Sequence, residues 1–308
     1  MKKAMFGLAA FFVCSTVFAG GGGSSSKPLQ GMYPIVLSHG LFGWGDSDPN
    51  GLINIAKYWG GMDDYLRSQG ATVYAPQKSA ANSNEVRAQE LKDKILYYMA
   101  ANGYSGKVHI VGHSQGTLDS RYMIANLGMA SKVSTYTSLA GVHRGSPIAD
   151  LVKAVIPDWL KPSVSAVLGV LVQLVWGGGQ QNALGALNSL TTEGMAAFNN
   201  YTPNSAAVKY FSYSAHITIP DLIQHPLMAI LQPINAIGGV IKGLGAANDG
   251  LVPVESAKWG NYRGEPSYGI LTTGIDHLQI ANTLWSGQTW YDVEGFFLKF
   301  AKEAKTNQ

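Results

Sequence analysis

Short apolar stretches alternate with longer amphipathic stretches along much of the chain. Five of the apolar stretches are brief and rich in β-branched or aromatic residues, which predicts buried strands. These strands are expected at residues 33–37, 71–75, 107–111, 133–139 and 208–213. Apolar residues at helical spacing predict helices between them, for example over residues 85–101 and 117–125. Strands that alternate with helices predict a mainly parallel, doubly wound sheet with helices on both faces, an α/β fold.

Two apolar segments, at about 151–179 and 217–247, depart from this alternation. Pro220, Pro226 and Pro233 are expected to break the second segment into short helices. Both segments could be ordinary core helices. We interpret them instead as helical cap or lid insertions, because the glycines and prolines around them could act as hinges. An apolar inner face would suit a lid that opens against oil rather than water.

The N-terminus has the pattern of an export signal. Residues 1–19 combine a positive start, an apolar core and a small residue at the expected cleavage site, Ala19, which is typical of a signal peptide. Residues 20–31 follow as a flexible linker rich in glycine and serine. Residues 32–308 are long enough to form one large domain. We therefore expect a secreted, extracellular protein, with the periplasm as the alternative location.

The single cysteine, Cys14, lies within the predicted signal peptide. A lipid anchor on Cys14 is the alternative interpretation, but the bulky Phe12 and Val13 before it fit such a site poorly. The exported protein would therefore contain no disulfide, and its stability would depend on its core.

Charge is sparse along the chain. The formal net charge is +3, and loss of Lys2 and Lys3 with the signal peptide would leave +1. So small a charge argues against nucleic acid as a partner. Only 13% of the residues are charged, against about 25% in typical soluble domains. A chain with so few charges is expected to expose a large apolar surface, which points to an apolar substrate.

Residues 112–116 read G-H-S-Q-G, between the predicted strand at 107–111 and the predicted helix at 117–125. In this context G-x-S-x-G is typical of a nucleophile elbow, a turn so tight that the central Ser114 adopts a strained backbone conformation. The Ser114 hydroxyl would stand at the N-terminal end of a helix, where the dipole stabilises developing negative charge. The motif thus predicts Ser114 as a nucleophile and the fold as an α/β-hydrolase.

A serine nucleophile needs a histidine base that is oriented by a carboxylate. In α/β-hydrolases both follow the serine, and the acid precedes the histidine. His277 lies late in the chain, just before the last predicted helix, where the base belongs. The other histidines precede Ser114, belong to the elbow or precede the expected acid; they are His39, His109, His113, His143, His216 and His225.

The candidate acid is Asp249, in an Asn-Asp-Gly turn sequence between Ser114 and His277. Its side chain could instead simply stabilise that turn. Two other aspartates are rivals for the role. Asp276 is next to His277, so the two side chains should diverge, and Asp221 lies in the predicted cap.

The tetrahedral intermediate of ester cleavage needs two backbone N–H groups aimed at its oxygen. One should come from Gln115, the residue after the nucleophile. The other should come from the loop after the first strand, where Gly40 and Gly43 permit a tight turn that presents the Leu41 N–H. An ordinary glycine turn is the alternative interpretation. Each such donor contributes roughly 3 kcal/mol to stabilisation of the transition state.

Together these motifs resemble the secreted bacterial true lipases of the Pseudomonas, Burkholderia and Proteus type, which are α/β-hydrolases that act on triacylglycerols. The resemblance covers most of the chain, and several motifs in one order carry it. They are residues 34–43, 83–87, 112–116, 189–194, 248–252 and 276–278. The resemblance implies Ser114, Asp249 and His277 as the catalytic triad. It also implies the Leu41 and Gln115 amides as the oxyanion hole.

Two features of that family are changed in this chain. Many members contain a disulfide, for which this chain lacks the cysteines. Members also bind a structural calcium ion through an aspartate two residues after the catalytic histidine and a glutamine a turn later. Those positions are Gln279 and Thr283 here, both neutral, and Asp221 alone could match the remaining aspartate ligand. A hard dication prefers several carboxylate oxygens, so we expect no required cofactor and no strong calcium site.

The function predicted from the sequence is a secreted serine ester hydrolase that forms an acyl-enzyme, with triacylglycerol as the expected ester. A monomer would meet this lipid at an oil–water interface, and a folding chaperone is a candidate partner. Alternatives with the same chemistry are a polyester depolymerase, a carboxylesterase and an acyltransferase. A hydrolase-like binding protein without activity is the alternative from another class, and it would require a broken triad.

Overall fold

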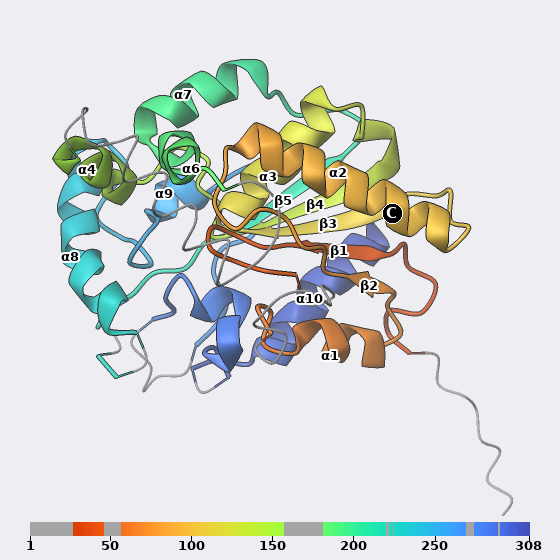
Figure 1. The fold of residues 1–308 in the computed structure, drawn as a ribbon. Helices are drawn as coiled ribbons and strands as arrows, with labels where there is room; N and C mark the ends of the chain where they lie inside the picture. Colours follow the sequence, from red (N-terminus) through yellow and green to blue (C-terminus); the bar gives the residue numbers. More distant parts are fainter. Residues whose placement is uncertain are drawn as a thin grey trace, which may run out of the picture.

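The computed structural model describes residues 27–45, 57–156, 181–219, 222–223, 225–268, 274–288 and 290–308. The predicted signal peptide, most of the predicted linker, the 157–179 part of the first cap segment, Pro220 and Asp221 lie outside these residues. Within them the chain forms a central sheet with helices on both faces (Figure 1).

Among the described residues, six strands form one sheet in the order β2-β1-β3-β4-β5-β6, and each strand is parallel to its neighbours. The strands are β1 (Ile35–Ser38), β2 (Val73–Tyr74), β3 (Val108–His113), β4 (Val133–Leu139), β5 (Lys209–Tyr213) and β6 (Asn261–Tyr262). The predicted parallel sheet is therefore confirmed. The apolar stretches predict five of these strands, whereas β6 is too short to carry a pattern.

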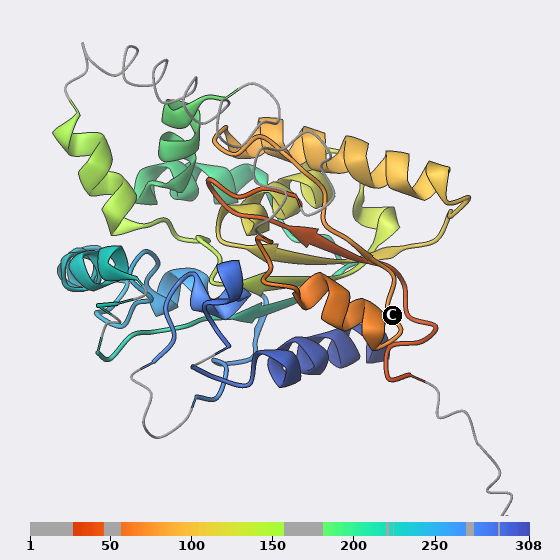
Figure 2. The same ribbon diagram turned by 60° about the horizontal axis from the view of Figure 1, so that its bottom comes forward.

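Helices cover both faces of the sheet, as the alternation predicts. On one face lie α2 (Asn84–Ala101) and α3 (Gln115–Asn126), which follow the second and third strands along the chain. On the other face lie α1 (Met62–Ser68) and α10 (Val293–Thr306), which pack together although they are far apart in sequence (Figure 2).

Each face of the sheet has its own core. In β1, Val36 is buried with α2 and α3, whereas Ile35 and Leu37 are buried with α1 and α10. Burial on both faces explains why the strands are continuous apolar runs in the sequence. Leu29, within the predicted linker, is fully buried in the α1–α10 core, so the end of that linker is part of the packed structure.

The remaining helices lie mostly toward the left of Figure 1. They are α4 (Pro147–Val155), α6 (Ala183–Leu190), α7 (Thr192–Tyr201), α8 (Pro226–Ile241) and α9 (Val254–Ala257). Short 3₁₀ turns occur at η1 (Ala130–Lys132), η2 (Gln279–Ala281) and η3 (Thr283–Trp285). None of the described helices is both long and apolar enough to span a membrane.

The expectation that prolines break the second cap segment is wrong for α8. Pro226 occupies the first turn, where helical N–H groups have no partner in any case. Pro233 lies inside the helix and removes one backbone hydrogen bond. The helix nevertheless continues because it packs closely against α4, where Gly238 approaches Pro147.

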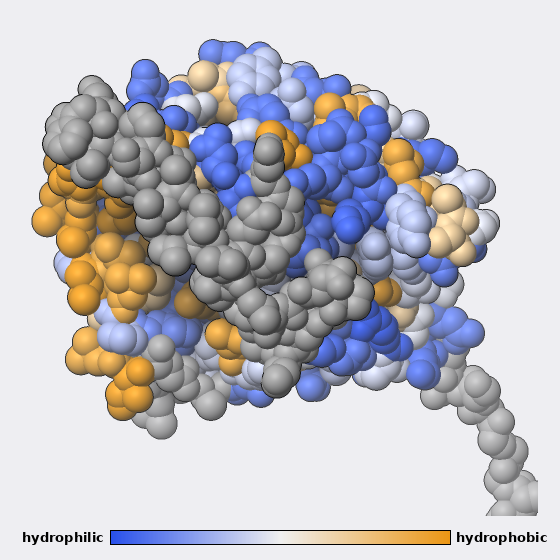
Figure 3. All heavy atoms as spheres, in the orientation of Figure 1, coloured by the Kyte–Doolittle hydropathy of each residue, from blue (hydrophilic) through white to orange (hydrophobic). Residues whose placement is uncertain are grey.

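Large apolar side chains are exposed on α4 and α8, the helices of the two predicted cap segments, and Figure 3 shows hydrophobic residues gathered at that side of the molecule. On α8 they are Leu227, Ile230, Ile234, Ile237, Val240 and Ile241, and on α4 they are Leu151, Val152 and Val155. We call this set the α4–α8 apolar surface. It agrees with the exposed apolar surface that the low charge content predicts.

Candidate active site

Ser114 lies at a sharp turn between β3 and α3. Its backbone has φ 54° and ψ −127°, a strained conformation for a residue with a side chain. The approach of strand and helix requires a glycine at position 116, because a Cβ there would lie 2.2 Å from Ser38 O. Ser114 is 8% exposed. Strand, strained serine and helix thus have the arrangement of a nucleophile elbow.

Asp249 and His277, which are predicted as acid and base, are joined by two hydrogen bonds. His277 Nδ1–H donates to Asp249 Oδ2 (2.8 Å), and the backbone N–H of His277 donates to Asp249 O (2.9 Å). Asp249 Oδ1 accepts from the N–H groups of Leu251 (3.0 Å) and Val252 (2.7 Å), which fixes the carboxylate. Because Nδ1 holds the proton, the Nε2 atom of His277 retains the lone pair that a general base needs.

Asp276, the neighbouring rival, turns away from His277. Its Oδ1 accepts from two backbone N–H groups of the following turn, both at 2.8 Å, and its Oδ2 pairs with His225 Nδ1. The adjacent side chains therefore diverge as expected, and Asp249 is the carboxylate bonded to the His277 ring. Asp221, the other rival, lies outside the described residues.

The loop after β1, residues 38–43, lies against the elbow, and we call it the oxyanion loop. A Cβ on Gly40 would lie 2.8 Å from Ser114 Cβ, so loop and nucleophile are in contact. Gln115 is the first residue of α3, where a helical N–H has no carbonyl partner in the helix. Within the described residues, the N–H of Leu41 donates to no acceptor either. Two N–H donors are thus available close to Ser114, as an oxyanion hole requires.

A chain of hydrogen bonds connects His277 with the oxyanion loop. His113 Nε2–H donates to His277 O (2.8 Å), the Tyr58 hydroxyl donates to His113 Nδ1 (2.6 Å), and Gly40 N–H donates to the Tyr58 oxygen (3.0 Å). Burial and the neighbouring His277 lower the pKa of His113 well below its usual value, so its ring is neutral and makes both bonds. The rings of His113 and His277 have centroids 4.8 Å apart, which places His277 beside the turn of Ser114.

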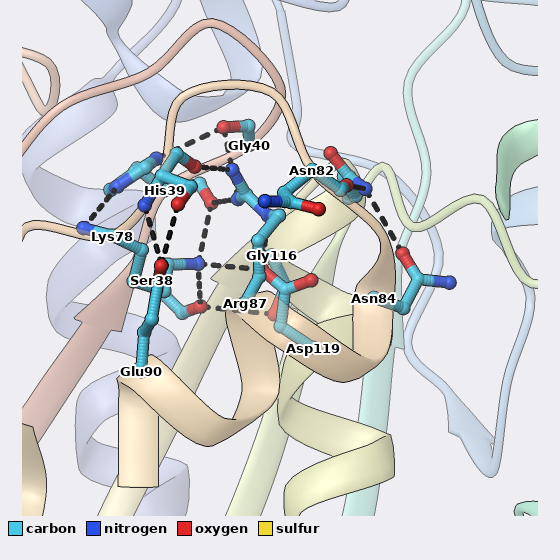
Figure 4. A network of polar contacts seen from close by, with 12 residues as sticks. Ser38, His39, Gly40, Lys78, Asn82, Asn84, Arg87, Glu90, Gly116 and Asp119 are labelled. Atoms are coloured by element: carbon cyan, nitrogen blue, oxygen red, sulfur yellow. Dashed lines mark hydrogen bonds and ion pairs between the residues drawn. The ribbon is translucent and has the colours of Figure 1, made fainter. Parts of the chain in front are cut away.

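A buried cluster of charged side chains lies next to the oxyanion loop (Figure 4). Lys78 Nζ and Arg87 Nε both donate to Asp119 Oδ2, at 2.6 and 2.9 Å. Both cations also donate to His39 O, Lys78 at 3.0 Å and Arg87 at 2.7 Å. No motif in the sequence indicates this cluster. The available signal was Asp119, an acidic residue in the first half of the elbow helix.

Known proteins resemble this chain over most of its length. A triacylglycerol lipase of Vibrio cholerae is 34% identical over 285 residues, which cover 84% of this chain and 86% of that protein. A triacylglycerol lipase of Pseudomonas fragi is 36% identical over 205 residues, which cover 60% of this chain and 67% of that protein.

The chain belongs to the bacterial triacylglycerol lipases. It also falls within the palmitoyl protein thioesterase family, whose model matches residues 34–217. The solved structure of Staphylococcus hyicus lipase has the same fold, with a TM-score of 0.65 at 19% identity over 89% of this chain and 96% of that one. The predicted α/β-hydrolase fold and the predicted enzyme class, a carboxylic ester hydrolase, are confirmed.

The family's calcium-ligand positions carry neutral side chains in this lipase, the amide of Gln279 and the hydroxyl of Thr283. Gln279 Oε1 accepts from the Asp276 N–H (2.9 Å), and Thr283 Oγ1 is buried without a partner among the described residues. The part of the chain that the structure describes contains no group of three or more acidic, histidine or cysteine side chains that could hold a metal. Direct contacts of Asp276 and Asp249 hold the loop around His277.

Proposed function

We propose that this lipase hydrolyses triacylglycerols through an acyl-enzyme, with Ser114 as nucleophile, His277 as general base and Asp249 as the acid of the triad. The observation that carries the proposal is the buried hydrogen bond between Asp249 and His277, beside the strained turn of Ser114. The names of the relatives, which are triacylglycerol lipases, support the choice of ester.

In the first half-reaction, Ser114 Oγ attacks the ester carbonyl carbon while His277 Nε2 takes the hydroxyl proton. Asp249 stabilises the resulting imidazolium. The carbonyl oxygen becomes negative and accepts hydrogen bonds from the N–H groups of Leu41 and Gln115. The bond between carbon and the alcohol oxygen then breaks, and His277 gives its proton to the leaving alcohol.

In the second half-reaction, water attacks the acyl carbon and His277 takes one of its protons. The bond to Ser114 Oγ breaks, and His277 returns the proton to that oxygen. One water is consumed, and one alcohol and one carboxylic acid leave for each ester. Every proton moves between groups of this chain, water and substrate, so we propose that no cofactor is required.

The α4–α8 apolar surface supports an ester that forms its own phase, because exposed apolar area of this kind gains free energy on contact with oil. The substrate would then have medium or long acyl chains, met at an oil–water interface. We propose that the enzyme acts as a secreted monomer, exported by residues 1–19. A folding chaperone remains a candidate partner, and the periplasm remains the alternative location.

Replacement of the nucleophile tests this function. Ser114→Ala should lower kcat for a soluble p-nitrophenyl ester and for emulsified triolein by about 10⁴-fold or more, because the acyl-enzyme is proposed to form on this hydroxyl. Labelling by a fluorophosphonate should disappear, while the melting temperature stays unchanged. Ser131→Ala, at an exposed serine after α3, is the control and should behave as wild type.

Retention of activity or labelling in Ser114→Ala would contradict the proposed mechanism. A panel of triacylglycerols, short soluble esters, a polyester film, a palmitoyl thioester and an alcohol acceptor separates the remaining alternatives. Faster turnover of any of these than of triacylglycerol would move the assignment to the corresponding esterase, depolymerase, thioesterase or acyltransferase. A wild type that neither hydrolyses nor labels would be the non-catalytic binding protein.

A further inference from the structure

Lys78 connects the end of β1 with the elbow helix at two points. Its Nζ donates to Asp119 Oδ2 (2.6 Å), Ser38 Oγ (2.8 Å) and His39 O (3.0 Å). An ammonium group has three N–H donors, so all of them are used. The Ser38 hydroxyl continues the connection by donating to Gly116 O (3.0 Å) (Figure 4). One buried side chain therefore bridges two elements that no local sequence pattern brings together.

These connections lie beside the two proposed oxyanion donors. Leu41 follows His39 by two residues in the oxyanion loop. Gln115 precedes Asp119 by one helical turn, so the two residues share a face of α3. A displacement of Lys78 would therefore change the separation and direction of the N–H groups of Leu41 and Gln115.

Folding stability does not account for a second cation in this cluster. Arg87 already pairs with Asp119 and donates its other N–H groups to backbone carbonyls. Burial and the neighbouring Arg87 lower the pKa of Lys78 to about 7. Glu90, the nearest further carboxylate, is engaged by the N–H and hydroxyl of Ser79. An apolar residue of similar volume is often at least as stabilising as a buried ion. The role of Lys78 is therefore to hold the groups that it contacts in position.

We propose that Lys78 is a positioning residue for the oxyanion hole, whose ammonium group fixes the end of β1 against α3 so that the N–H groups of Leu41 and Gln115 point at one oxygen. This inference rests on the proposed ester hydrolysis. Arg87 assists by holding His39 O (2.7 Å), but it does not reach the connection through Ser38. The effect belongs to the transition state, because the substrate oxygen becomes negative only there.

The test is Lys78→Met, which keeps the length of the side chain and leaves Arg87 and Asp119 as a one-to-one pair. For a soluble p-nitrophenyl ester assayed below pH 7, where Lys78 is charged in the folded chain, kcat should fall about 10- to 100-fold, with KM changed less than about threefold. Affinity for an alkyl boronic acid, which forms a tetrahedral adduct on Ser114, should fall in the same proportion as kcat. The melting temperature should be unchanged or higher. Lys302→Met, at an exposed lysine on α10, is the matched control and should change none of these.

The stability of the two proteins should also differ in its dependence on pH. In the unfolded chain Lys78 titrates near 10.5, whereas in the folded chain it titrates at about 7. Between these values the unfolded state binds more protons, so this group makes the free energy of unfolding rise with pH. The free energy of unfolding of wild type, relative to that of Lys78→Met, should therefore increase as the pH rises from about 7 to 10.5.

Full kcat in Lys78→Met would overturn the inference, as would a lower kcat with unchanged boronic acid affinity. Ser38→Ala, a smaller change that removes the link to Gly116, is measured in the same way and should lose less activity. If Lys78→Met does not fold, unchanged kcat and boronic acid affinity in Ser38→Ala would overturn it instead. A wild type without esterase activity or fluorophosphonate labelling would refute the proposed function itself, which is a distinct result.

Discussion

Tyr58 is the residue that links the oxyanion loop with the side of His277 through hydrogen bonds. Its hydroxyl accepts from Gly40 N–H and donates to His113, which in turn donates to His277 O. Tyr58 and His113 each accept one hydrogen bond and donate one in this series. Removal of the Tyr58 oxygen therefore leaves a buried N–H and a buried ring nitrogen without these partners.

We predict that Tyr58→Phe lowers the free energy of unfolding by about 1–3 kcal/mol, the cost of leaving buried polar groups unsatisfied. It should also lower kcat for a soluble ester about tenfold, which corresponds to ~1.4 kcal/mol of the barrier, because Gly40 and His277 lose their common support. Urea unfolding and steady-state kinetics measure the two effects. Tyr97→Phe, at an exposed tyrosine of α2, is the control. Normal kcat in Tyr58→Phe would show that the hydrogen bonds from Gly40 through Tyr58 and His113 to His277 do not position the site.

At the scale of helices and strands, the sequence predicts those elements that have a local pattern of apolar residues or glycines. The apolar run before residue 112 and the glycines around Ser114 predict β3, the elbow and α3 to within two residues at each end. β6 has two residues and no period, so nothing local indicates it. The continuity of α8 through Pro233 depends on packing against α4, which is a contact between distant segments.

The same distinction, between local sequence patterns and contacts of distant segments, applies to the residues of the active site. Ser114, Asp249 and His277 could be selected because the order of the triad along the chain restricts the candidates. Lys78 and Asp119 lie 41 residues apart, and their contact depends on the sheet order β2-β1-β3, which brings the segment after β2 beside α3. A pairing of this kind can be recognised only in the tertiary structure, since neither residue belongs to a recognisable sequence motif.

The apolar face of α8 leads to a prediction about substrate form. Ile230 and Ile237 are 61% and 66% exposed and lie two turns apart on the same face. Burial of an isoleucine in oil gains about 1.5–3 kcal/mol, so the double change to serine should lower hydrolysis of emulsified triolein at least about tenfold. Hydrolysis of a soluble short ester should stay the same, because no residue of the proposed triad is touched. Tyr97→Ser on α2 is the control, and an equal loss on both substrates would contradict an interfacial role.

At the scale of the whole molecule, a side-chain pair joins the segment before α8 to the loop that contains the proposed base, His277. His225 directly precedes α8 and pairs with Asp276, which also accepts from the backbone of the following turn. The single cysteine, Cys14, lies in the predicted signal peptide, so no disulfide within the chain can supply this link. The residues at the family's calcium positions, Gln279 and Thr283, are neutral. Among the described residues, the contacts of Asp276 with His225 and with the following turn hold the loop.

We predict that this loop depends on His225 rather than on a divalent cation. Treatment with EDTA should shift the melting temperature by less than about 1 °C, because no ligand specific to the folded state is removed. His225→Ala should lower the free energy of unfolding by about 2 kcal/mol, less than for a fully buried pair. His216→Ala is the matched control, since His216 pairs with Glu265 in a more exposed position, and it should cost less than about 1 kcal/mol. A melting temperature that falls in EDTA and recovers with calcium would contradict the prediction and would direct attention to Asp221 as a ligand.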